Sequence, residues 1–134
     1  MLDGSCLCGA VKYQIDGELG PIVCCHCSMC RKAQGTAFAT NAPVEAARFH
    51  ITRGEQALRA YPSSPGKWRC FCSICGSPLF SKTERDPGTI RLRIGTLDSK
   101  IPARPTAHIH VASKAEWFEI IDGLPQYAQL EPTR

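Results

Sequence analysis

The sequence predicts a mainly β protein built from short antiparallel strands. Several segments alternate apolar and polar residues with a period of two, which is the pattern of half-buried strands. Turn-forming residues separate these segments at short intervals, and the sequence lacks the 3.6-residue periodicity of a long amphipathic helix. At 134 residues the chain is expected to form one zinc-binding domain over residues 1–134, with a core that needs no disulfides.

The clearest strand patterns lie in residues 11–16, 49–51 and 90–94. In the last of these, Ile90 and Leu92 alternate with Arg91 and Arg93, so the two arginines are expected to share one face of a strand. Short helical turns are expected at residues 30–34 and 44–47, but neither is long enough to organise a core. Near the C-terminus, the apolar residues are expected to serve as packing material; they are Trp117, Phe118, Ile120 and Ile121.

Charge and hydropathy exclude several classes of function. The net charge of +4 comes from 16 Lys and Arg against 12 Asp and Glu, and the basic residues are scattered, so no nucleic-acid partner is expected. Such a surface mildly favours small anionic ligands over cationic ones. No apolar stretch approaches the roughly 18 residues of a membrane span. The first residues lack a basic start followed by an apolar run, so we expect a cytoplasmic protein with reduced thiols and no membrane partner.

Nine cysteines in three groups are the strongest signal in the sequence. In a strand, C-x-C places both sulfurs on one face, and C-x-x-C in a turn aims two sulfurs at one point. Both spacings suit tetrahedral thiolate coordination, and all-thiolate sites favour zinc over hard cations such as magnesium. The groups are Cys6 and Cys8; Cys24, Cys25, Cys27 and Cys30; and Cys70, Cys72 and Cys75.

Counting these sulfurs predicts two zinc ions, one closed by four cysteines and one held by three. Structural zinc is usually closed by four protein ligands, whereas catalytic zinc keeps one position for water or substrate. Closing the loop between the first and last groups costs roughly 4 kcal/mol of chain entropy. Structural zinc binding is worth about 10–16 kcal/mol in small peptides, so the metal is expected to hold that loop closed. The closed set is Cys6, Cys8, Cys72 and Cys75, and the three-cysteine set is Cys25, Cys27 and Cys30.

Two alternatives to this assignment are open. Spacing alone allows Cys24 to replace Cys25, although the repeated pattern C-x-C-S-x-C at residues 25–30 and 70–75 favours Cys25. Cys24 and Cys70 would then be ordinary buried thiols. The second alternative is that both sites are inert, with a residue from elsewhere in the chain as the fourth ligand of the three-cysteine site.

Histidines and basic residues near these motifs are further candidates. Strand alternation predicts that His26 points away from the metal, to lie behind the ligands or at the surface. The same alternation places His108 and His110 on one face, where they could cap a pocket, complete a metal site or form the polar side of a strand. Arg31 and Lys32 could balance the charge of a zinc tris-thiolate, or simply begin a solvated helix.

The sequence resembles the glutathione-dependent formaldehyde-activating enzyme (GFA) family. The resemblance is carried by residues 4–13, 25–32 with Gly35, 71–77 and 122–127, in that order along nearly the whole chain. It implies a β-tent, which is two stacked antiparallel sheets with zinc knuckles. It also implies a structural zinc on the four-cysteine set and a second zinc on the three-cysteine set, in agreement with the ligand count.

The resemblance further implies a carbon–sulfur lyase that condenses formaldehyde with glutathione to S-hydroxymethylglutathione. Its partner would be a small thiol substrate such as glutathione, which zinc at Cys25, Cys27 and Cys30 could take as a fourth ligand. His108 is the candidate acid or base, because of its place in the family pattern. The alternative is a non-catalytic zinc module that binds a protein partner. The sequence predicts no particular oligomeric state.

Overall fold

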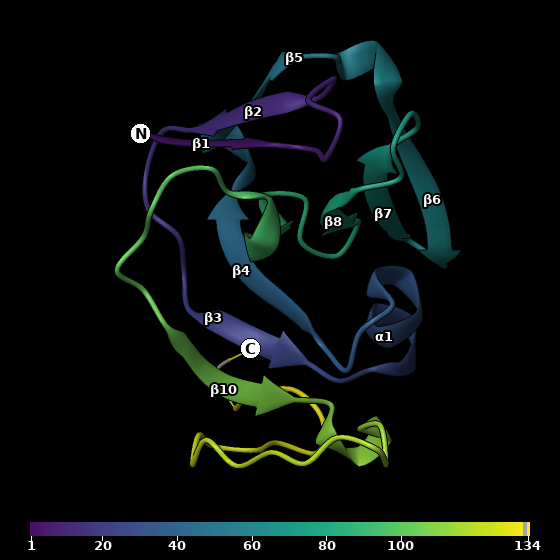
Figure 1. Cartoon of the computed structure of the whole chain (residues 1–134), viewed down its shortest axis with the longest axis vertical. Coiled ribbons are helices and arrows are strands. Elements are labelled where there is room, and N and C mark those ends of the chain that lie inside the picture. Colours follow the sequence, from purple (N-terminus) through teal and green to yellow (C-terminus); the bar gives the residue numbers. More distant parts are fainter. Residues whose placement is uncertain (133) are drawn as a thin grey trace.

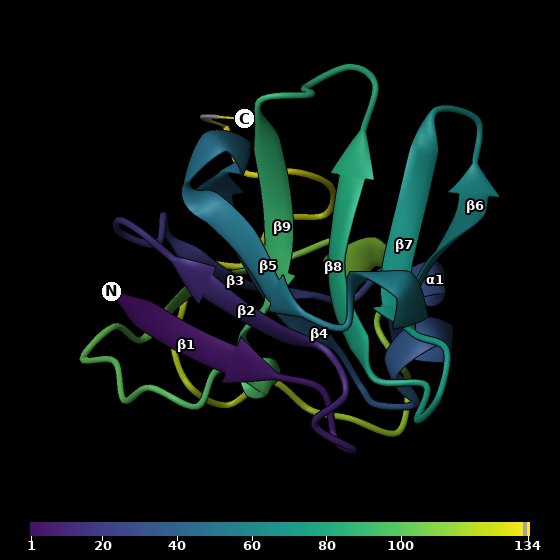
Figure 2. The same ribbon diagram turned by 90° about the horizontal axis from the view of Figure 1, so that it is seen from above.

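The predicted mainly β fold with two sheets is confirmed by a computed structural model, which describes residues 1–132 and 134. Figures 1 and 2 show the smaller sheet stacked against one part of the larger sheet. The three-stranded sheet has the order β1-β2-β5, with β1 at Leu2–Ser5, β2 at Lys12–Ile15 and β5 at Phe49–Arg53.

The larger sheet has seven strands in the order β10-β3-β4-β9-β8-β7-β6. All its neighbouring strands are antiparallel except β10 and β3, which run parallel. This pairing departs from the expectation of purely antiparallel sheets, and it places Ile109 opposite Cys25. The strands are β3 (Ile22–Cys25), β4 (Ala39–Glu45), β6 (Leu58–Ser64), β7 (Lys67–Cys72), β8 (Pro78–Thr83), β9 (Thr89–Arg93) and β10 (Pro105–Ile109).

Aromatic and aliphatic side chains fill the space between the two sheets. The Phe49 ring of β5 lies 5.1 Å from the Tyr13 ring of β2 and 4.9 Å from the Phe80 ring of β8, so it joins the sheets. The Tyr13 ring also explains why residue 4 is a glycine, because a Cβ atom on Gly4 would lie 2.1 Å from that ring. Burial of these apolar groups is the main stabilising contribution to the fold.

The opposite face of the seven-stranded sheet carries charged side chains. In β9, Ile90 and Leu92 belong to the core between the sheets, whereas Arg91 and Arg93 line a cavity. The shared face predicted for the two arginines is therefore confirmed. Because side chains alternate along a strand, this one short strand supplies side chains to both the core and the cavity wall.

Helix α1 (Ser28–Gln34) begins two residues before the expected turn, because Cys27 serves as its N-cap. Gly35 ends the helix in the left-handed conformation, with φ 68°, and its N–H donates to the carbonyl of Arg31. The expected turn at residues 44–47 is only partly correct, since Val44 belongs to β4. The remaining helical segments are single 3₁₀ turns: η1 (Ala46–Arg48), η2 (Glu55–Ala57), η3 (Ile94–Thr96) and η4 (Val111–Ser113).

The C-terminal segment packs less tightly than expected. Trp117 and Ile121 are 70% and 85% exposed, so the expectation that they serve as packing material is wrong. Phe118 does pack, with its ring centroid 5.5 Å from that of Phe38. Figure 1 shows this segment beside β10, at the end of the molecule opposite the small sheet. Within the described residues, no helix has the length and apolarity needed to cross a membrane.

Candidate metal centres

Two groups of cysteine sulfurs converge in the structure. In each group, all the sulfur atoms lie within 4.8 Å of one another. The first group joins two turns distant in sequence, one after β1 and one after β7, and consists of Cys6, Cys8, Cys72 and Cys75. The second lies where β3 leads into α1 and consists of Cys25, Cys27 and Cys30.

The geometry of the four-cysteine group fits a tetrahedral metal ion. The Sγ atom of Cys8 lies 3.6 Å from that of Cys6 and 3.9 Å from that of Cys72. A zinc site with Zn–S bonds of about 2.3 Å has sulfur–sulfur edges of about 3.8 Å, whereas a disulfide brings the sulfurs to about 2.05 Å. The separations therefore suit thiolates around an ion, and all nine cysteines are free.

Tight turns aim these four sulfurs at one point. Gly76 has φ 80°, which favours glycine, and its N–H donates to the Cys72 carbonyl at 2.8 Å. Cys75 follows β7 in the same turn, and the nearby Ser77 hydroxyl, 3.3 Å from its sulfur, lowers the pKa of Cys75 to about 5. On the other side, the Val11 N–H donates to Cys6 Sγ at 3.3 Å. These contacts thus favour negative charge on the Cys6 and Cys75 sulfurs.

The three-cysteine group is set by the transition from strand to helix. Cys25 is the last residue of β3, and Cys27 is the N-cap of α1. The Cys30 N–H donates to Cys27 Sγ at 3.2 Å, so the first helical turn brings these two sulfurs together. Among the described residues, no fourth His, Cys, Asp or Glu side chain joins the group. The group therefore offers three sulfur ligands from the described residues.

Two buried arginines supply positive charge to this group. The Arg69 Nη1 atom donates to Cys30 Sγ at 3.7 Å. Hydrogen bonds from the Cys25 and Cys27 thiols lower the pKa of Cys30, and the charges of Arg69 and Arg93 lower it further. In return, contact with Cys27 and Cys30 raises the pKa of Cys25. The two arginines thus favour negative charge on the Cys30 sulfur.

The other two cysteines stand apart from both groups. Cys24 precedes Cys25 in β3 but its side chain points elsewhere, as strand alternation requires. It is buried, and burial raises the pKa of Cys24 to about 11. Cys70 is also buried, and burial raises its pKa as well. The structure thus groups Cys25, rather than Cys24, with Cys27 and Cys30.

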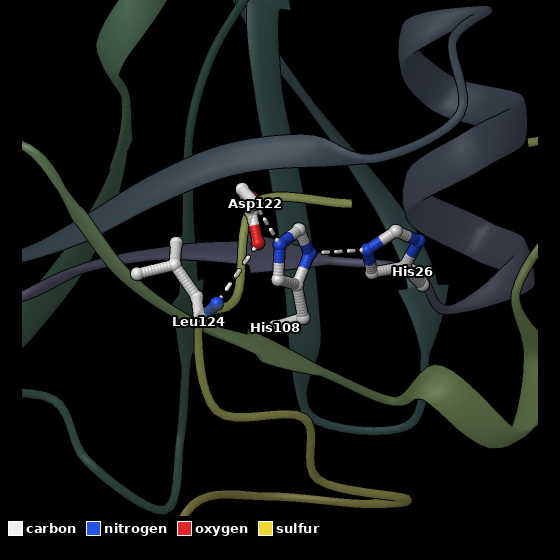
Figure 3. A network of polar contacts seen from close by, with 4 residues as sticks. All are labelled: His26, His108, Asp122 and Leu124. Atoms are coloured by element: carbon white, nitrogen blue, oxygen red, sulfur yellow. Dashed lines mark hydrogen bonds and ion pairs between the residues drawn. The ribbon is translucent and has the colours of Figure 1, made fainter. Parts of the chain in front are cut away.

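His26, which lies between two of the clustered cysteines, turns away from them. It is fully buried, so the surface position considered for it is wrong, and the expected orientation away from the sulfurs is right. His26 Nε2 lies 2.8 Å from His108 Nδ1, and His108 Nε2 lies 2.8 Å from Asp122 Oδ2. Figure 3 shows His108 between the other two side chains. Asp122 also accepts a hydrogen bond from the Leu124 N–H at 3.0 Å.

These contacts define the protons on both imidazoles. A carboxylate only accepts, so His108 Nε2 donates to Asp122, and the His108 Nδ1 atom of a neutral ring accepts from His26 Nε2. Burial, together with nearby positive charge, lowers the pKa of His26 to about 4, so His26 is neutral at pH 7. The hydrogen bond from His108 lowers the pKa of Asp122. The network thus holds the imidazole of His26, the residue between Cys25 and Cys27 in sequence, on the side away from the sulfurs.

His108 and His110 do not share a face, contrary to the expectation from alternation. Strand β10 ends at Ile109, and His110 has φ 54°, in the left-handed region that residues with a side chain rarely adopt. This backbone reversal directs His110 into a cavity of about 560 Å³ beside the three-cysteine group. His108 does not line that cavity, and both its ring nitrogens have partners. Its catalytic role stays a prediction.

The residues that surround the sulfurs were only partly anticipated. Arg31 and Lys32 belong to α1 and do not line the cavity, whereas Lys67 and Arg93 do. The sequence does carry a signal for these residues, because basic residues alternate with other residues at 67–69 and 91–93. In a strand, this alternation directs both cations of each pair to one face of the sheet. What the sequence lacked was the strand order that brings β7 and β9 to opposite sides of β8.

Comparisons with known proteins agree with this arrangement. The family model described as glutathione-dependent formaldehyde-activating enzyme matches residues 1–113. A relative from Halomonas elongata, provisionally named as a glutathione-dependent formaldehyde-activating enzyme, is 33% identical over 129 residues, which cover 90% of this chain and 81% of the relative. A crystal structure of a Rhodobacter sphaeroides protein has a similar fold, with a TM-score of 0.62 and 24% identity, over 75% of this chain and 91% of that one.

Proposed function

Because this chain belongs to the glutathione-dependent formaldehyde-activating enzyme family, we propose that it is a zinc-dependent carbon–sulfur lyase. Its substrate would be the adduct of a small thiol, such as glutathione, with an aldehyde or similar electrophile. The observation that carries the proposal is the group of three sulfurs within 4.8 Å beside a cavity, with no fourth protein ligand among the described residues. A purely structural site would be expected to close with four.

Each cysteine group has its own role in the proposal. Zinc held by Cys25, Cys27 and Cys30 would bind the substrate sulfur and lower the pKa of a thiol. The four-cysteine group would hold a structural zinc that links β1 to β7, and its ligands are Cys6, Cys8, Cys72 and Cys75.

The reaction itself requires no redox partner. In the cleavage direction, the carbon–sulfur bond breaks and its electron pair goes to sulfur. The hydroxyl on the same carbon loses its proton, and its oxygen–carbon bond becomes a carbonyl. Addition of the thiol to the aldehyde is the reverse, so the protein has to hold a thiolate beside a carbon and exchange one proton.

Two features of the chain support these requirements. The Arg69 guanidinium, which donates to Cys30 Sγ, favours thiolate over thiol at the sulfur cluster. For the proton, the proposal assigns His110 rather than His108. The side chain of His110 lines the cavity, and its strained backbone is of the kind often found at functional sites. His108 would act by orienting His26.

Cobalt in place of zinc provides the test of this function, because cobalt in a thiolate site has a visible spectrum that reports its ligands. Adding glutathione to the cobalt protein should change that spectrum and release or absorb heat. The Cys27→Ser protein, loaded in the same way, should show neither change. An unaltered spectrum and no heat with the unmodified protein would count against the proposed function.

A further inference from the structure

The cavity beside the three-cysteine group is strongly cationic. Among the described residues that line it, six carry a positive charge and one, Asp86, carries a negative charge. Its volume of about 560 Å³ suits a small molecule. The positive residues are Lys67, Lys82, Arg85, Arg91, Arg93 and Arg134.

Part of this charge is built into the sheet rather than scattered on the surface. Arg91 and Arg93 come from one face of β9, because Ile90 and Leu92 occupy the other face. Lys67 extends from β7, and β8 lies between these two strands. Fixed cations on a rigid sheet, with low-dielectric walls around them, focus positive potential in the cavity.

Arg93 is the most informative of these residues. It is only 4% exposed, its Nε atom has no hydrogen-bond partner, and its Nη1 atom makes one long bond of 3.4 Å to the Arg91 carbonyl. Within the described part of the chain, neither Arg91 nor Arg93 forms an ion pair with an acidic side chain. A buried guanidinium without a counterion is costly, so the site calls for negative charge from outside the chain.

The three thiolates supply only part of that charge. Around a divalent ion they carry a single net negative charge, while Arg69, Arg93 and Lys67 contribute three positive charges close to the sulfurs. A thiolate from the substrate would balance one more. The remaining cations, including Arg91, call for further oxyanions on the same molecule.

From this balance we infer that the cavity prefers a small thiol whose other ionised groups are all oxyanions over one that also carries an ammonium group. This substrate class rests on the proposed function for its thiol. The oxyanions would be held by Arg91 and Arg93. Arg134 pairs with Glu131 at 2.8 Å, but the other five cations have no such ion pair among the described residues. An ammonium group would lie among these cations, so a zwitterionic thiol such as glutathione binds less favourably than a purely anionic one.

A graded series of thiols tests this selection by calorimetry on the zinc-loaded protein. The probes are 2-mercaptoethanol, 3-mercaptopropionate and mercaptosuccinate, which carry no, one and two carboxylates. The affinity should rise about tenfold with each carboxylate at low ionic strength, and the gain should shrink in salt. Mercaptosuccinate should also bind more tightly than glutathione. Equal affinities across the series, or tighter binding of glutathione, would overturn the inference.

Variants show whether the arginines cause the selection. Arg91→Met and Arg93→Met should each lower the affinity for mercaptosuccinate about tenfold, and each should lower the affinity for 2-mercaptoethanol much less. Arg53→Met, at an exposed position in β5 outside the cavity, is the matched control. Because Arg91 is only partly buried, its variant keeps the test valid if Arg93→Met fails to fold. A normal preference in the Arg91→Met protein would contradict the assigned role.

Two probes without a thiol separate this inference from the proposed function. Succinate and inorganic phosphate should bind to the zinc-loaded protein and weaken in the Arg91→Met variant. The anion that binds more tightly identifies the preferred oxyanion as a carboxylate or a phosphate. If neither anion binds, the proposed oxyanion site is overturned. If they bind while no thiol alters the cobalt spectrum, the oxyanion site stands and the thiol assignment falls with the proposed function. If thiols alter the spectrum without any charge preference, the function stands and this inference fails.

Discussion

The Nη1 atom of Arg69 lies 3.7 Å from the Sγ atom of Cys30, so a buried guanidinium faces one sulfur of the three-cysteine group. Arg69 belongs to β7 and Cys30 to α1, and the two residues are 39 positions apart in sequence. Two further nitrogen atoms of this guanidinium, Nε and Nη2, have no hydrogen-bond partner. The arginine is therefore placed for the sulfur cluster rather than for another protein group.

Replacing Arg69 with Met should weaken metal binding at the three-cysteine group. A hydrogen bond to a charged group contributes about 1.5–3 kcal/mol, so the zinc affinity of this site should fall at least about tenfold. Competition with a chromophoric chelator measures it, and the four-cysteine site should keep its affinity. Arg53→Met serves as the control. An unchanged affinity in the Arg69→Met protein would show that the contact does not stabilise the thiolates.

Metal content should distinguish the two sites. The protein purified with zinc should hold two ions per chain, and Cys27→Ser should hold one. Cys24→Ser should keep both ions, because Cys24 lies outside both sulfur groups. Elemental analysis of each protein checks these counts. One ion in the unmodified protein, or a loss of zinc from the Cys24→Ser protein, would contradict the assignment.

The four-cysteine site should contribute more to stability than the three-cysteine site. Cys8 and Cys72 are 64 positions apart, so a metal that joins them removes up to about 4 kcal/mol of chain entropy from the unfolded state. The three-cysteine group spans only residues 25–30 and closes a short loop. Cys8→Ser should therefore lower the midpoint of thermal unfolding more than Cys27→Ser does, as measured by circular dichroism. Equal losses would contradict the structural role of the first site.

The local chemistry of the metal groups could be predicted from sequence because it depends on spacing. The turn at residues 72–75 and the helix start at residues 27–30 each bring two sulfurs together within four residues. Choosing Cys25 over Cys24 was also possible, since the repeated pattern encodes which sulfur precedes the turn. Hydrophobic alternation likewise predicted the two faces of β9.

The rest required long-range pairing that spacing does not encode. The parallel pairing of β10 with β3 brings His108 to His26 and His110 to the cavity, although strand alternation alone placed both residues on one face. Alternation failed because the strand ends at Ile109. The position of Arg69 beside Cys30 similarly depends on how β7 packs against α1. Such contacts follow from the order of strands in the sheet.

Tyr13 should make the protein less stable in strong alkali. Its hydroxyl donates to Thr96 Oγ1 at 2.7 Å, and Thr96 in turn donates to the Arg93 carbonyl at 2.8 Å. Burial raises the pKa of Tyr13 from 10 to about 12. Above pH 10 the unfolded chain loses this proton while the folded chain keeps it, so stability should fall by about 2–3 kcal/mol up to pH 12.

Tyr13→Phe isolates this effect, because the other alkaline groups titrate equally in both proteins. The variant should lose about 1 kcal/mol at neutral pH with the hydrogen bond, and its stability should decline less between pH 10 and 12. Urea unfolding across that range measures the difference. Parallel declines of the two proteins would show that the Tyr13 phenol does not titrate differently on folding.

Asp122 should control the protonation pattern of two histidines that lie behind the three-cysteine group. Its carboxylate is 47% exposed, yet it accepts from buried His108, which accepts from buried His26. Asp122→Ala removes the acceptor that holds the proton on His108 Nε2, so both rings should lose their single tautomer. Asp122→Asn, the matched control, keeps an oxygen that can accept and should preserve the pattern. Nitrogen NMR of the imidazoles distinguishes these states.

Because His26 lies between Cys25 and Cys27, the Asp122→Ala protein loaded with cobalt should also show a shifted visible spectrum. Fixed tautomers together with an unchanged spectrum in that protein would mean that His108 does not need Asp122 to orient His26.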